Sequence, residues 1–167
     1  MAGVATVLWM FLENKNQLLL NDNLWFLDYI TLLFMAVGIY MVVLKKRDEL
    51  GGAITFKQAM QSGLITTFVV AVMAGLFSYI YFKYTDAGYA EQLAQHFIQM
   101  YKKNLGKGLT SIEETTLLAN ARAQYSAAGQ LMSSTGGNMF SGLFITLIVA
   151  GMMKRKREEV FKTINND

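Results

Sequence analysis

The stretch GLITTFVVAVMAGLFSYIYF, residues 63–82, contains no charged residue and no proline. As a helix it would be about 30 Å long, which matches the hydrocarbon thickness of a bilayer. Two further apolar runs accompany it: 24–44, where Asp28 is the only charge, and the uncharged run 136–153. An apolar run of about 18 residues or more is long enough to cross a bilayer as a helix. The three runs therefore predict an integral membrane protein.

The composition favours long, uninterrupted helices. The chain has 167 residues, 53% of them hydrophobic, with no proline and no cysteine. Disulfides, thiolate nucleophiles and cysteine metal sites are thereby excluded, and nothing forces a kink into a helix. The net charge of +3 does not indicate nucleic-acid binding, because the basic residues gather at the ends of the apolar runs. We expect one small all-α domain that contacts membrane lipids and no nucleic acid.

The basic residues predict how the helices are oriented. Cytoplasmic loops of membrane proteins carry an excess of lysine and arginine. Here that excess falls on the loop 45–57 and on a basic tail, 154–167. The orienting residues are Lys45, Lys46, Arg47, Lys154, Arg155, Lys156 and Arg157. Segment 85–135, whose charges balance, is then extracytoplasmic, and both termini are expected in the cytoplasm.

The first apolar segment, 1–12, is ambiguous. As a helix it would be about 18 Å long, short of a bilayer core of about 30 Å. A signal peptide is disfavoured, because the segment has no basic start and no small-x-small cleavage site. A translation start placed too far downstream would give the same pattern. We expect a small bundle of four, and at least three, transmembrane helices, with spans at about 3–20, 24–44, 59–83 and 136–153.

Segment 85–135 is predicted to be an extracytoplasmic helical hairpin. Its second helix should begin at the capping box formed by Thr110 and Glu113. Apolar residues then follow at heptad spacing: Leu118, Ala121, Tyr125, Ala128 and Met132. This seam is thin and rich in alanine, so it either packs on the first helix of the hairpin or docks on another protein. The partner-binding candidates are Leu118, Tyr125 and Met132. A flexible joint, Ser133–Gly137, is expected to lead into the last span.

Small residues predict which membrane helices touch. Lipid gives helices no hydrophobic reason to associate, so close packing of small residues matters more than in water. Two sets recur every four positions, one in each of the last two apolar runs: Thr67, Ala71 and Gly75, then Gly142, Thr146 and Ala150. We expect the two ridges to pack on each other. The alternative is that a ridge faces another subunit.

Few residues suggest chemistry. Asp28 lies near the outer end of its run beside Trp25 and Tyr29, so it is either hydrated at the interface or has a proton or cation role. His96 is the only histidine, and no second histidine or cysteine could complete a metal site with it. No nucleophile–base pair, GxSxG or HExxH motif is visible. We expect no enzymatic activity, no cofactor and no metal.

The block Tyr40–Tyr84 resembles a known family. It contains KKRDE at 45–49, GGxITFxQA at 51–59 and YIYFK at 79–83. In these motifs the chain is similar to small bacterial inner-membrane proteins grouped as domain of unknown function 4199. The resemblance implies four membrane helices in the cytoplasmic membrane of a Gram-negative-type bacterium, and it implies no activity. The sequence departs from the family pattern at its N-terminus, where the first helix is short.

Two functions remain open. The first is a non-catalytic accessory or structural subunit of a larger cytoplasmic-membrane assembly, whose partner the sequence does not identify. The alternative is a small oligomeric transporter or channel. The sequence favours the subunit, because its apolar runs contain no paired charges and no proline-broken helix of the kind that builds many transport sites.

Overall fold

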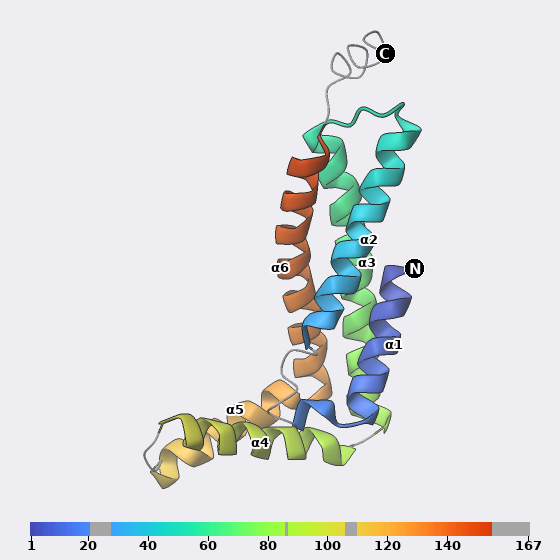
Figure 1. Ribbon diagram of the computed structural model, residues 1–167. Coiled ribbons are helices and arrows are strands. Elements are labelled where there is room, and N and C mark those ends of the chain that lie inside the picture. The colour runs from blue at the N-terminus through green and yellow to red at the C-terminus, as the bar shows by residue number, and fades with distance from the viewer. Residues whose placement is uncertain (21–27, 86, 106–109, 155–167) are drawn as a thin grey trace.

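The computed structural model describes residues 1–20, 28–85, 87–105 and 110–154, and its regular elements in this part of the chain are helices. They are α1 (Ala2–Lys15), the short turn η1 (Leu18–Leu20), α2 (Asp28–Glu49), α3 (Phe56–Ile80), the π-helical turn η3 (Tyr81–Thr85), α4 (Ala87–Leu105), α5 (Ser111–Tyr125) and α6 (Ala127–Met153). Figure 1 shows α1, α2, α3 and α6 side by side, with α4 and α5 lying across one end.

Three helices are long and apolar enough to cross a membrane. They are α2 over Tyr29–Glu49, α3 with η3 over Phe56–Tyr84, and α6 over Ala127–Met153. The structure confirms the predicted all-α fold, with three helices in its described part that have the length and composition of membrane spans. The predicted first span differs in detail, because α1 has 14 residues and is followed by η1 rather than by more helix. In Figure 1, α1 lies beside the half of the bundle nearer α4.

Most basic residues of the described bundle helices gather at one end, although Lys15 and Lys83 lie at the other. α1 and α3 run towards α4 and α5, whereas α2 and α6 run away from them (Figure 1). The remote end therefore holds Lys45, Lys46, Arg47, Lys57 and Lys154, and we call it the basic end. Arg155, Lys156 and Arg157 lie outside the described residues. We call the opposite end the α4–α5 end.

The link between α2 and α3 is a tight turn that ends in a capped helix start. Gly51 and Gly52 have φ angles of 76° and 86°, a region that side chains other than glycine rarely adopt. Thr55 then accepts a hydrogen bond from the Gln58 backbone, and the Gln58 side chain accepts one from the Thr55 backbone at 3.0 Å. This capping box satisfies two groups at the start of α3 and holds the turn closed.

The α3–α6 contact is the most extensive between helices, and small residues build it. The two predicted ridges lie buried here: Thr67, Ala71, Gly75, Gly142, Thr146 and Ala150. The Thr67 and Thr146 hydroxyls are 3.3 Å apart and fully buried. A Cβ atom added to Gly142 would collide with the Thr67 side chain. The two backbones can therefore approach closely only because these positions are small.

The connection between α5 and α6 differs from the prediction. We expected a flexible joint at Ser133–Gly137, but α6 is helical from Ala127 onwards. The break lies earlier, at Ser126, whose hydroxyl accepts a hydrogen bond from the Gly129 backbone at 3.1 Å and so caps α6. The expected seam is consequently divided between two helices, with its last members, Ala128 and Met132, on α6.

Candidate functional site

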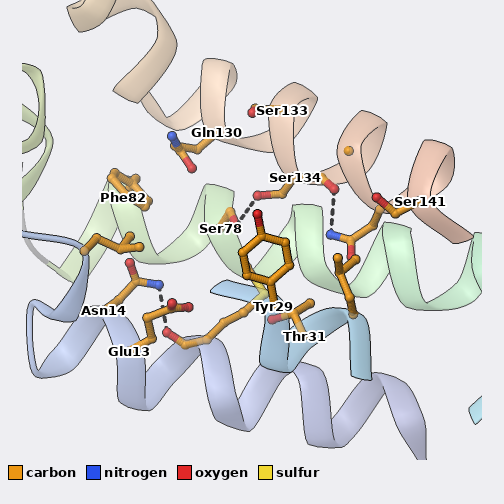
Figure 2. A pocket seen from close by; sticks show the side chains of 15 residues that line it. Glu13, Asn14, Tyr29, Thr31, Ser78, Phe82, Gln130, Ser133, Ser134 and Ser141 are labelled. Atoms are coloured by element: carbon orange, nitrogen blue, oxygen red, sulfur yellow. Dashed lines mark hydrogen bonds between the residues drawn. The ribbon is translucent and has the colours of Figure 1, made fainter. Parts of the chain in front are cut away.

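An open cavity, lined mainly by polar residues, lies between the helices of the bundle towards the α4–α5 end. Its volume is about 320 Å³. Side chains from α1, η1, α2, α3, η3 and α6 line it: Met10, Glu13, Asn14, Leu19, Tyr29, Thr31, Leu32, Ser78, Phe82, Gln130, Ser133, Ser134, Gly137, Asn138 and Ser141. Figure 2 shows the polar members of α1 facing those of α3 and α6, with Tyr29 between them. Most of the lining residues are Ser, Thr, Tyr, Asn, Gln or Glu, which is unusual for the interior of a membrane bundle.

The α6 wall carries a polar stripe. Gln130, Ser134, Asn138 and Ser141 recur every three or four positions, so they share one face of the helix. From Gln130 to Ser141 the helix rises about 16 Å. The next residue, Gly142, packs on Thr67 near the middle of α3. The cavity therefore extends from the α4–α5 end to about the middle of the bundle.

Hydrogen bonds hold this wall in place. The Ser78 and Ser134 hydroxyls are 2.8 Å apart and join α3 to α6. The Asn138 amide donates to the Ser134 carbonyl at 2.8 Å, within α6. Both contacts are drawn as dashed lines in Figure 2. These bonds allow a serine-rich segment to remain helical, which explains why the predicted joint did not form.

The α1 wall supplies a carboxylate and an amide. The exposed fractions of Glu13 and Asn14 are 6% and 4%, although both residues line the cavity. The Asn14 amide nitrogen donates to the Met10 carbonyl at 2.8 Å. Its Oδ1 atom is buried and accepts no hydrogen bond. In Figure 2 this oxygen points from α1 towards the side on which Gln130 lies. Asn14 thus places an unpartnered acceptor within the wall of the cavity.

The first turn of α2 forms a third part of the wall. Tyr29, Thr31 and Leu32 come from this turn, and Tyr29 is largely exposed. Asp28, the carboxylate singled out from the sequence, is the first residue of α2. Its side chain lies outside the described part of the structure, as does Trp25. The carboxylate that the structure places in the cavity is Glu13.

The predicted partner-binding residues lie on two helices, Leu118 and Tyr125 on α5 and Met132 on α6. Tyr125 packs against an aromatic cluster built on Tyr81, Phe82 and Tyr89, and Leu118 is half-buried. Met132 has an exposed fraction of 75%. Met132 therefore differs from the other two in its exposure and in the helix that carries it.

Two ion pairs fasten α4 to α5. Arg122 donates to both Glu91 carboxylate oxygens, at 2.8 and 2.7 Å, and Lys102 donates to Glu114 at 2.6 Å. The hydrogen bonds from Arg122 lower the pKa of Glu91 below its ordinary value. The pKa of Glu113 is also lowered, because its carboxylate accepts from the Thr110 backbone in the predicted capping box. These pairs are exposed and lie outside the cavity.

No metal centre is visible in the described residues. Within 1–20, 28–85, 87–105 and 110–154, no three His, Cys, Asp or Glu side chains come together. His96 is on α4, away from the residues that line the cavity. The cavity is therefore the candidate site that the described residues offer.

The comparison with protein families decides the family. The sequence matches the family described as "Protein of unknown function (DUF4199)" over residues 1–155. The chain belongs to this family. No curated protein and no solved structure matches the chain. The DUF4199 description assigns no activity.

Most of the cavity residues were missed in the sequence. Glu13 and Asn14 end a short apolar segment, where a polar pair looks like the start of a loop. Of the cavity residues on α6, Ser133, Ser134 and Gly137 looked like a linker because their segment is rich in serine and glycine, whereas Asn138 and Ser141 lay within the predicted last span. The available signal was their spacing, since Gln130, Ser134, Asn138 and Ser141 follow the period of a helix.

Proposed function

We propose that this DUF4199 protein binds a small polar solute in the cavity, as the solute-binding unit of a small transporter. One observation carries the proposal: a polar cavity with a buried carboxylate extends about 16 Å along α6 into a bundle of apolar helices. Polar groups at membrane depth are costly unless they line water or bind a solute. A site of this kind near the middle of a bundle is where transporters hold their substrates.

The proposal includes an orientation. The basic end faces the cytoplasm, because lysine and arginine are concentrated on that side of membrane proteins. The α4–α5 pair, the proposed extracytoplasmic hairpin, then lies outside, and the cavity opens towards it. We propose both termini on the cytoplasmic side: α6 ends at the basic end, and α1 runs away from that end, beginning beside the middle of the bundle (Figure 1). The membrane we propose is the cytoplasmic membrane of a Gram-negative-type bacterium.

Cysteine accessibility tests this role. The natural chain has no cysteine, so Ser134→Cys introduces a single thiol. An impermeant maleimide added outside intact cells should label it, because Ser134 lines the cavity. Phe144→Cys is the matched control, since Phe144 is on the same helix and outside the cavity lining. Labelling of Phe144→Cys alone, or labelling of Ser134→Cys only from the cytoplasmic side, would contradict the proposal.

A role as accessory subunit is a second proposal, and the exposure of Met132 favours it. Met132 presents most of its side chain at the start of α6, close to the α4–α5 end. An exposed apolar side chain on a membrane helix contacts either lipid or another membrane protein, and the second contact is the one proposed here. The mass of the native particle in mild detergent tests this role. Met132→Ser should release any bound subunit and so lower the mass of the particle. An unchanged mass would remove the support that Met132 gives to the accessory role.

A further inference from the structure

We propose that the cavity binds a small organic cation that carries an ammonium group. Glu13 supplies the counter-charge, and Asn14 Oδ1 accepts a hydrogen bond from the ammonium. This inference rests on the solute-binding role proposed above and names the chemical class of the solute. Three features of the cavity support it: its charge, its available acceptor, and its size with its aromatic wall.

The ionisable groups of the cavity favour a positive ligand. Glu13 is the one carboxylate among the described lining residues, and none of these residues is lysine, arginine or histidine. Glu13 is also almost fully buried, and burial makes a carboxylate charge costly, so a bound cation would offset that cost. An anionic solute would find no cationic side chain in this lining, whereas a cation would meet a carboxylate.

Asn14 favours a ligand that donates hydrogen bonds. Its side chain is buried, and its Oδ1 atom has no hydrogen-bond partner. Buried polar atoms are nearly always paired, because an unmet acceptor keeps its desolvation penalty. An ammonium N–H beside Glu13 could donate to this oxygen. A quaternary ammonium could not, so the pair Glu13–Asn14 favours a primary or secondary ammonium.

The dimensions of the cavity favour an organic cation over a bare metal ion. A volume of about 320 Å³ equals the share of about ten water molecules. A dehydrated metal ion needs several oxygen ligands within about 2.6 Å, which a space of this size does not supply by itself. Tyr29 and Phe82 add aromatic surface to the lining, and aromatic faces attract organic cations.

Charge-selective modification tests the assignment. Ser141→Cys places a thiol at the inner end of the cavity of the otherwise cysteine-free chain. In liposomes, the cationic trimethylammonium-ethyl methanethiosulfonate should modify this thiol about tenfold faster than the anionic sulfonato-ethyl reagent, after division by their rates with β-mercaptoethanol. Glu13→Gln should abolish the preference, and Glu13→Asp should keep it. Glu49→Gln, at the basic end, should leave it unchanged.

A protection experiment identifies the class of cation without a substitution at Glu13. Butylammonium chloride should slow modification of Ser141→Cys by a neutral maleimide, and sodium chloride at equal concentration should not. Asn14→Leu should weaken this protection. Equal protection by the two salts, or none by butylammonium, would overturn the ammonium assignment.

The two proposals fail in different ways. If no reagent reaches Ser141→Cys although Ile112→Cys on exposed α5 reacts, the cavity is closed and the solute-binding role itself fails. If both charged reagents react with a ratio that Glu13→Gln does not change, solute entry stands and the ammonium assignment is overturned.

Discussion

Gly142→Leu should destabilise the protein by opening the α3–α6 contact. A Cβ atom at Gly142 would lie 2.7 Å from the Thr67 hydroxyl oxygen and 2.8 Å from the Met35 sulfur, besides colliding with the Thr67 methyl group. Both neighbours are fully buried and have little room to move. Overpacking of this kind costs about 1–3 kcal/mol, and leucine adds three more heavy atoms. Replacing glycine within a helix returns about 0.8 kcal/mol. We therefore expect a net loss of about 2 kcal/mol.

Gly151→Leu is the matched control on the same helix. No atom lies within 4 Å of a Cβ placed there, so the helix-propensity gain should appear without the collision. The free energy of unfolding of each variant can be measured by denaturant titration in a fixed mixed micelle. Gly142→Leu should fall well below the wild type, and Gly151→Leu should equal or exceed it. If the two variants have the same free energy of unfolding, close packing of α3 on α6 is not what stabilises the bundle.

Three further predictions concern individual contacts. Thr67→Val and Thr146→Val should show a coupling energy of about 0.6 kcal/mol in a double-mutant cycle, because their hydroxyls share one buried hydrogen bond; additive losses would rule that bond out. Because the pKa of Glu91 is lowered, its ion pair with Arg122 stabilises the α4–α5 pair at pH values above the ordinary carboxyl pKa of 4.5. This stability is lost as the pH falls through the lowered pKa. In the wild type, amide hydrogen exchange in α4 should become faster as this stability is lost, whereas the exchange in Arg122→Gln should depend far less on pH. Identical pH profiles for the two proteins would disprove the stabilising role of the Glu91–Arg122 pair. Ser134→Ala leaves the buried Ser78 hydroxyl without its partner and should cost about 1 kcal/mol, measured by the same titration, and a neutral effect would show that water replaces the bond.

The sequence predicted the membrane helices and their closest contact for simple physical reasons. Uncharged runs of about 20 residues have few alternatives to a membrane helix. Residues four apart share a helix face, so the spacing of small residues was enough to assign Thr67 and Thr146 to contact ridges. The capping boxes at Thr55 and Thr110 were also predictable, because they depend on residues three positions apart.

The cavity could not be predicted in the same way, because it depends on contacts between distant segments. A serine-rich sequence favours loops locally. Ser134 nevertheless lies in a helix, and its hydroxyl is hydrogen-bonded to the hydroxyl of Ser78, 56 positions away. Glu13 has no sequence neighbour that indicates burial. Its position follows from the packing of α1 on α2 and α3, which places Glu13 in the wall of the cavity that α6 also lines. The break at Ser126 was likewise hidden within a continuous heptad pattern.

A cysteine scan along α6 tests the central claim most directly, namely that a water-filled cavity extends into the bundle. Single cysteines would replace each residue from 130 to 148 in turn, and a water-soluble maleimide would report the labelling rate at each position in liposomes. The account predicts fast labelling at Gln130, Ser134, Asn138 and Ser141, and slow labelling at Phe140, Phe144 and Ile148. A rate that declines smoothly with depth, irrespective of helix face, would contradict the cavity and the function proposed from it.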